Sequence, residues 1–135
     1  MTKALSVIGS DFPDSPALIM YLHELFESQL DEHANAPAIS GAASLTYQEV
    51  EERSNRIANH LRGLGVGPGK LVGLLFHRSE LPILAILGVL KAGGGYVPLD
   101  LSYLDDRMRY VLTEAEVGVV ICEAKTRHRI DAVFD

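Results

Sequence analysis

An uninterrupted apolar segment, Leu-Val-Gly-Leu-Leu-Phe at residues 71–76, constrains the fold more than any other feature of this chain. A strand with one face in water alternates apolar and polar residues, whereas a strand covered on both faces is apolar throughout, as in parallel sheets. The helix predicted over Glu80–Ala92 is apolar almost all round, which is typical of a buried helix. Further strands are predicted at Tyr96–Pro98 and Val117–Cys122. The strand–helix alternation predicts an α/β fold, namely a partial doubly wound parallel sheet with flanking helices and right-handed crossovers.

The segment before this strand predicts a helix, a hairpin and a second helix. Apolar residues recur at helical spacing over about Leu22–His33. Two short apolar pieces, 38–40 and 44–46, are separated by one glycine and two alanines and predict a small hairpin. Thr46 and Glu49 have the spacing of a capping box, in which each residue satisfies a backbone N–H near the other. The helix that follows is predicted to carry one apolar face and to end at two glycines: Val50, Ser54, Ile57, Ala58 and Leu61, then Gly63 and Gly65.

The two ends of the chain differ in character. Residues 1–20 are rich in glycine, serine, aspartate and proline, which predicts a leader or linker ahead of a folded part at 21–135. Asp105 and Asp106 are expected to open a connecting helix, because negative charge suits the positive end of the helix dipole. A last helix is predicted from about Thr126.

Charge and composition exclude several classes of partner. The net charge is −6 and no run of basic residues occurs, which argues against a nucleic-acid-binding surface. The longest apolar run, Leu81–Leu90, is shorter than the roughly 20 residues that a membrane-spanning helix needs. The only cysteine, Cys122, cannot form an internal disulfide, which fits a reducing compartment. We therefore expect a cytoplasmic protein without nucleic-acid or membrane partners.

Two glycine-rich segments resemble phosphate-binding loops only superficially. In the segment 64–71, Leu64 and Leu71 stand where a P-loop requires glycine and a hydroxyl residue, and a helix precedes the loop instead of following it. Gly93–Gly95 follow the carboxyl end of a helix, where the dipole repels anions. Both segments are therefore interpreted as structural, the second as a helix stop that also permits close backbone packing.

Few residues are candidates for chemistry. His77-Arg78-Ser79 follows the strand predicted at 71–76, at the edge where open α/β sheets bind ligands, although a loop with a helix cap is the simpler interpretation. Asp105-Asp106 could bind magnesium, but a helix start explains the pair better, and Cys122 is expected in the core and not as a nucleophile. The histidines lack the spacing of metal ligands on one helix face: His23, His33, His60, His77 and His128.

Two segments carry a family resemblance. Leu-Thr-Tyr-Gln-Glu-Val at 45–50 is similar to the first core motif of amino-acid-activating adenylation domains from nonribosomal peptide synthetases. Leu-Lys-Ala-Gly-Gly-Gly-Tyr-Val-Pro-Leu-Asp at 90–100 resembles the second. The similarity covers about residues 21–122, in order. The ending Tyr-Val-Pro-Leu-Asp favours the amino-acid branch over acyl-CoA ligases and luciferases. The chain departs from the family at Leu101 and Leu104, where proline is usual, so the loop before the next helix is less restricted.

The resemblance implies the N-terminal subdomain of an adenylate-forming enzyme. The parent reaction joins an amino acid to ATP, giving aminoacyl-AMP and pyrophosphate with magnesium, and then transfers the acyl group to a carrier-protein thiol. In the family the phosphate loop, pocket residues, acidic ribose contact and late lysine lie downstream of position 135. The resemblance therefore assigns no catalytic, cofactor-binding or metal residue here, and we expect no cofactor on this chain alone.

The sequence is compatible with several functional interpretations. The chain could be an inactive scaffold fragment, truncated before the phosphate loop and partnered by the missing remainder of the domain or by neighbouring synthetase domains. It could be a split-enzyme subunit completed by a second chain, or a non-catalytic interaction module. A small flavodoxin-like binding protein would need a ligand loop at a strand–helix junction, and none here has the required glycines or hydroxyls.

Overall fold

A parallel three-stranded sheet organises the molecule. The computed structural model describes residues 4–6, 19–40, 44–77 and 81–134. Strand β5 (Leu71–Leu75) lies in the centre, between β6 (Gly95–Pro98) and β7 (Val119–Cys122), and both neighbours run parallel to it. Val72 lies opposite Tyr96 on one side and Val119 on the other. The uninterrupted apolar run at 71–76 is thus the central strand, as its composition predicted.

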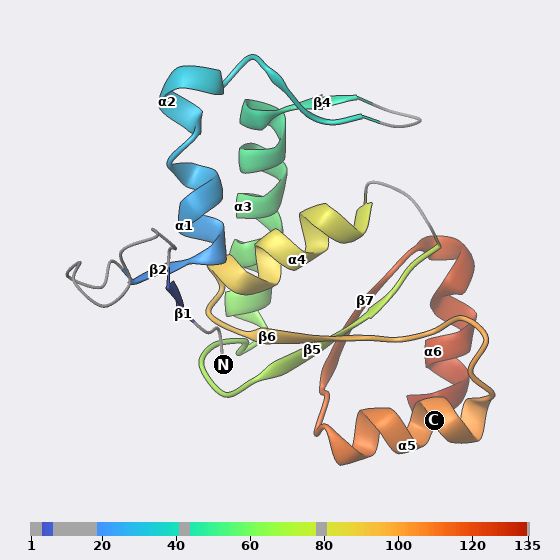
Figure 1. Ribbon diagram of the computed structural model, residues 1–135. Coiled ribbons are helices and arrows are strands. Elements are labelled where there is room, and N and C mark those ends of the chain that lie inside the picture. The colour runs from blue at the N-terminus through green and yellow to red at the C-terminus, as the bar shows by residue number, and fades with distance from the viewer. Residues whose placement is uncertain (1–3, 7–18, 41–43, 78–80, 135) are drawn as a thin grey trace.

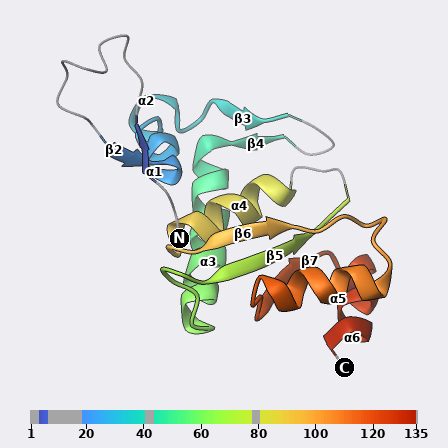
Figure 2. The same cartoon turned by 60° about the horizontal axis from the view of Figure 1, so that its bottom comes forward.

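Helices cover both faces of this sheet. Helices α3 (Tyr47–Gly63) and α4 (Leu81–Lys91) pack on one face, and α5 (Asp105–Glu114) and α6 (Arg127–Phe134) on the other (Figure 1). The short 3-10 helix η1 (Ala124–Thr126) leads from β7 into α6. Figure 2 shows the same layers from a second direction.

Alternate residues of β5 point into two separate cores. Val72 and Leu74 are buried with residues of α3 and α4, whereas Leu75 is buried with Met108 and Leu112 of α5. The chain passes from β5 through α4 to β6, and then back through α5 to β7 on the other side of β5. Because the two crossovers travel in opposite directions, right-handed connections place their helices on opposite faces. The predicted doubly wound arrangement is therefore confirmed.

The segments around the central unit confirm some expectations and correct others. Strands β3 (Pro37–Ile39) and β4 (Leu45–Thr46) form the predicted antiparallel hairpin, with residues 41–43 outside the described part. The Thr46 hydroxyl accepts a hydrogen bond from the Glu49 backbone N–H at 3.2 Å, and the Glu49 carboxylate accepts one from the Thr46 N–H at 2.8 Å. The predicted capping box is therefore present. Helix α3 ends at Gly63, and Gly65 takes the expected left-handed conformation with φ of 89°.

The prediction of one helix over Leu22–His33 is wrong. Two helices, α1 (Leu22–Glu27) and α2 (Leu30–His33), are separated by a turn. The Ser28 hydroxyl donates to the Leu25 carbonyl at 2.7 Å, and the Gln29 N–H bonds to the Phe26 carbonyl in a tighter turn. Serine side chains that bond to nearby backbone compete in this way with helix continuation.

The predicted leader contains paired backbone. Strands β1 (Ala4–Ser6) and β2 (Ile19–Tyr21) form an antiparallel pair, and β2 runs through position 20, where the leader was expected to end. No strand was predicted there, because the apolar residues of this segment are interrupted by proline and glycine.

Candidate functional site

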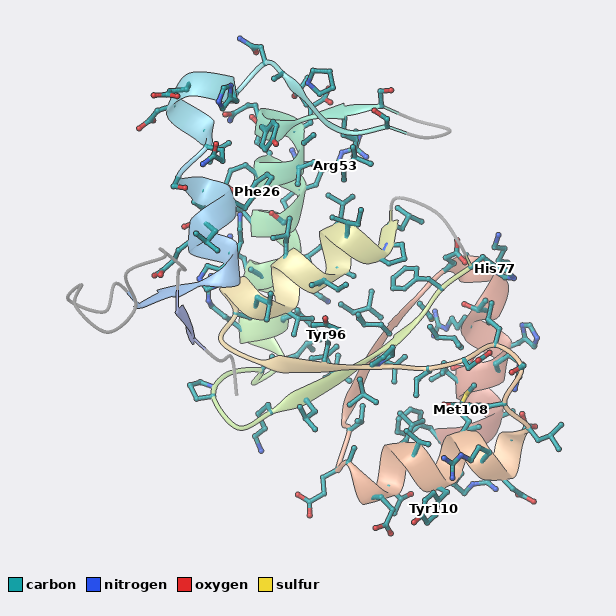
Figure 3. All side chains as sticks on the ribbon, viewed as in Figure 1. Phe26, Arg53, His77, Tyr96, Met108 and Tyr110 are labelled. Carbon is teal, nitrogen blue, oxygen red and sulfur yellow. The ribbon has the colours of Figure 1, made fainter. Side chains whose placement is uncertain are left out.

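The strand order defines where a ligand would be expected. The connections leaving the carboxyl ends of β5 and β7 run to opposite faces of the sheet, through α4 and through η1–α6. Open α/β sheets bind ligands in the crevice outside the carboxyl ends of such strands. Phe76 and His77 follow β5 at this edge, and Glu123 follows β7. Figure 3 places His77 at the end of β5, beside the start of the α6 region.

A hydrogen-bonded pair spans the crevice. One carboxylate oxygen of Glu123, Oε2, accepts from the His77 backbone N–H at 3.0 Å and lies 2.8 Å from His77 Nδ1. A carboxylate only accepts hydrogen bonds, so Nδ1 carries a proton, and a neutral ring then presents Nε2 as an acceptor. The imidazole is about half exposed (47%), whereas the Glu123 side chain is 12% exposed. The pair thus joins β5 to β7 at their carboxyl ends and fixes the ring's tautomer.

The charge of Glu123 is stabilised by its partners. The backbone hydrogen bond from His77 is the largest influence that lowers the pKa of Glu123 below its ordinary value, followed by the hydrogen bond from the His77 ring. Lys125 adds a weaker attraction, with its Nζ 3.8 Å from Oε1. Glu123 is therefore ionised at neutral pH and acts as a fixed acceptor.

Two open cavities flank the pair. One has a volume of about 480 Å³ and an almost wholly apolar wall formed by α3, α4 and the ends of β5 and β7, including Ile57, Leu84 and Ile121. The other has a volume of about 620 Å³ and is lined by seven residues: Phe76, His77, Pro98, Leu99, Asp100, Leu101 and Tyr103.

The second cavity carries negative charge. Asp100 accepts a hydrogen bond from the Ser102 backbone N–H at 2.8 Å, and this bond is the main reason that the pKa of Asp100 lies below its ordinary value. The ionised Asp100 carboxylate in the lining of this cavity disfavours an anionic ligand there.

Among the described residues, few cationic side chains line the two cavities. Clustered cations are one way in which proteins hold phosphate groups. The cavity beside Asp100 has no lysine or arginine in its lining, and the other cavity offers Lys125 alone. Within the described ranges, no group of three or more His, Cys, Asp or Glu side chains is arranged to hold a metal ion. The same part of the chain holds no helix long and apolar enough to cross a membrane.

Most residues considered from the sequence have structural partners. Asp105 lies 3.4 Å from Arg129, and Asp106 lies 3.3 Å from Arg109, both in the first turn of α5. The predicted helix start is therefore confirmed. Cys122 is half-buried, packs against the α5–α6 core and lines the apolar cavity. Of the candidate His77-Arg78-Ser79, only the histidine lies within the described residues.

Both glycine-rich segments prove to be structural turns. Gly93 has a φ of 87°, and the N–H groups of Gly93 and Gly94 bond to the carbonyls of Leu90 and Val89, which closes α4. A Cβ at Gly94 would lie 2.8 Å from Val66 Cγ1, so glycine there permits close packing. The P-loop-like segment at 64–71 connects α3 to the amino end of β5, away from the ligand-binding edge.

Sequence reasoning missed Glu123. It follows the apolar strand Val117–Cys122 directly, as His77 closely follows its own strand, so the rule that singled out His77 would also have found Glu123.

Comparisons with known proteins agree on one family. The family model described as AMP-binding enzyme matches residues 26–134. Tyrocidine synthase 3 of Brevibacillus parabrevis is 42% identical over 116 residues, which are 85% of this chain and 2% of that protein. The chain therefore spans about 2% of the length of this curated relative.

Solved structures of adenylate-forming enzymes superpose on the chain. The nonribosomal peptide synthetase FmoA3, bound to α-methyl-L-serine-AMP, matches with a TM-score of 0.75 and 34% identity over 79% of this chain and 12% of its own. The anthranilate CoA ligase AuaEII, in complex with anthranoyl-AMP, matches with a TM-score of 0.76 and 26% identity over 83% of this chain and 22% of its own.

Proposed function

Since this chain belongs to the AMP-binding enzyme family and corresponds to the N-terminal portion of a nonribosomal peptide synthetase adenylation domain, we propose that its role is architectural. It supplies the central sheet and the carboxyl-edge crevice of such a domain, and the groups that react with ATP are supplied from outside residues 1–135. The parent reaction is the activation of an amino acid by ATP to aminoacyl-AMP and pyrophosphate, followed by transfer to a carrier-protein thiol. In the complete domain, ATP would supply the phosphate that reacts, and magnesium would neutralise the charge of the phosphate groups.

One observation supports this proposal: the side chains of both motifs make contacts that hold the fold together. In the first motif, Thr46 and Glu49 bond to each other's backbone and begin α3. In the second motif, Lys91 is buried in an ion cluster, and Gly93 and Gly94 end α4. Side chains that are already paired inside the fold are unavailable to a substrate.

The crevice contributes shape and polarity. The His77–Glu123 pair holds the ends of β5 and β7 together, and the apolar cavity beside it offers a surface for further polypeptide. The residues here hold and orient the scaffold, and no step of the reaction is assigned to them.

Amino-acid-dependent exchange of labelled pyrophosphate into ATP tests the proposal. The purified 135-residue chain, verified as folded by circular dichroism, should give no exchange with any of the twenty amino acids, while a complete adenylation domain run in parallel should. Calorimetric titration with magnesium-ATP should show no saturable binding. Exchange above background, or saturable binding in the millimolar range or tighter, would overturn the architectural role.

A split-enzyme subunit is the second candidate, and the open apolar cavity beside edge strand β7 favours it. All four residues of β7 are partly exposed, as expected of a strand that has one neighbour among the described strands. Mixing this chain with a second chain that carries the downstream part of an adenylation domain should then restore exchange. If sedimentation instead shows a defined complex that gives no exchange, a non-catalytic interaction module is the better description. For either role we propose a cytoplasmic location, in keeping with the single unpaired thiol of Cys122.

A further inference from the structure

The only charged residue of α4, Lys91, is buried. Its side chain is 3% exposed, although the helix is otherwise apolar and ends at this residue. The ammonium nitrogen lies 2.6 Å from a Glu51 carboxylate oxygen, 2.9 Å from the Asn55 amide oxygen and 3.8 Å from a Glu27 carboxylate oxygen. Glu51 and Asn55 belong to α3, and Glu27 belongs to α1. Three helices that are distant in the sequence therefore meet at one cation.

A buried ammonium is stable only when it is paired and hydrogen-bonded. Here two partners come from α3, and the Glu51 carboxylate is itself only 16% exposed. The contacts from α1 are of a different kind. Glu27 is 40% exposed, and the Phe26 ring centroid lies 5.9 Å from the ammonium, within the range of a cation–π contact.

Aromatic packing reinforces the same junction. Phe26 stacks on Tyr47 of the first motif, with ring centroids 5.3 Å apart and an angle of 22° between the rings. Figure 3 shows Phe26 directed from α1 towards α3. On the far side of the junction, Arg62 of α3 donates to the Lys91 carbonyl at 2.6 Å, which ties the end of α4 to α3.

We propose that Lys91 is an ionic latch that fastens the N-terminal arm, defined as β1, β2, α1 and α2, onto the α3–α4 pair. Glu51 and Asn55 hold the ammonium in place from α3, and Glu27 with Phe26 attaches α1 to it. Release of α1 therefore breaks only the contacts of Glu27 and Phe26, while Lys91 stays paired with Glu51. The two motif segments and the arm thus pack together at Lys91, and the arm is the part that can separate from the others. The latch does not depend on the proposed function.

Hydrogen exchange of the α1 amides, measured by mass spectrometry on the whole chain, tests the latch. Amide exchange reports the free energy of local opening. Glu27→Gln removes one partly exposed ion pair, so α1 should exchange about 1.5- to 5-fold faster. Lys91→Met keeps most of the side-chain volume but removes the cation, so both contacts with α1 are lost and α1 should exchange about 3- to 25-fold faster. Glu32→Gln is the matched control, because Glu32 lies on the same arm, is 84% exposed and should leave α1 unchanged.

The double variant separates a latch from a general charge effect. Once Lys91 is methionine, adding Glu27→Gln should accelerate α1 exchange no further, because the partner of Glu27 is already gone. Exchange of α1 in Glu27→Gln equal to that in Glu32→Gln would overturn the proposal. An undiminished effect of Glu27→Gln in the Lys91→Met background would also overturn it. If Lys91→Met does not fold, the comparison of Glu27→Gln with Glu32→Gln decides the matter.

Discussion

Replacing Gly88 with alanine should destabilise the protein, although alanine is the better helix former. Gly88 lies in α4, where α4 crosses α3, and a Cβ at this position would lie 2.4 Å from Ile57 Cγ2 and 2.7 Å from Ile57 Cβ. Alanine gains about 1 kcal/mol in helix propensity. Overpacking a close contact costs about 1–3 kcal/mol. Because Ile57 Cβ is attached to the backbone, no side-chain rotation relieves the contact, so the upper part of this range applies. The free energy of unfolding should therefore fall by about 1–2 kcal/mol.

Urea unfolding followed by circular dichroism measures this difference. Gly63→Ala is the matched control, because Gly63 ends α3 and a Cβ there would meet nothing within 4 Å. That variant should gain about 0.4–1 kcal/mol, since alanine restricts the unfolded chain. In an Ile57→Ala background, Gly88→Ala should lower the free energy of unfolding by less than it does in the wild type, because the Cγ2 contact is already absent. If Gly88→Ala is as stable as Gly63→Ala, the close approach of α3 and α4 has no energetic consequence, and the reasoning fails.

Three further predictions concern the capping box and the carboxyl edge. Thr46→Ala removes the acceptor for the Glu49 N–H and should lower the free energy of unfolding by about 1 kcal/mol in the same urea assay. A lowered pKa in the folded state means that Glu123 contributes stability above its unfolded pKa, and that this contribution disappears as the pH falls through the folded value. Wild type should therefore lose more stability than Glu123→Gln between neutral and acidic pH, and parallel pH profiles would contradict the assignment. Long-range ¹⁵N NMR should find His77 Nδ1 protonated in the wild type, and a ring protonated only on Nε2 would exclude the pairing with Glu123.

The features predicted correctly from the sequence depend on interactions between residues that are close together in the chain. The capping box needs only two residues three positions apart, and the central strand needs only its own unbroken apolar composition. The stop of α4 at Gly93 likewise follows from one backbone conformation that glycine adopts readily. Each of these is determined within a few residues of where it occurs.

The features that the sequence did not reveal depend on the order of the strands in the sheet and on side chains from separate helices meeting in space. Glu123 bonds to His77 across 46 positions, and this contact exists only because β7 lies next to β5 and not next to β6. Periodicity predicts that strands occur but not which strands are neighbours. A lysine at the end of an apolar helix is ordinarily expected in water, and Lys91 is buried because α1 and α3 bring carboxylates to it. The break at Ser28 was missed because a helical pattern of apolar residues continues across it.

The position of β5 between two later strands has a consequence for synthesis on the ribosome. All fully buried residues of the core formed by α3, α4 and β5 are present once Ala92 has emerged, and only the partly buried Val119 and Ile121 of β7 join it later, whereas the core on the other face needs Val133 of α6. Chain growth is slow, at roughly 5–20 residues per second, compared with the folding of small units. One side of the sheet can therefore begin to pack while the other side is still uncovered, and the nascent polypeptide acquires its two layers in succession.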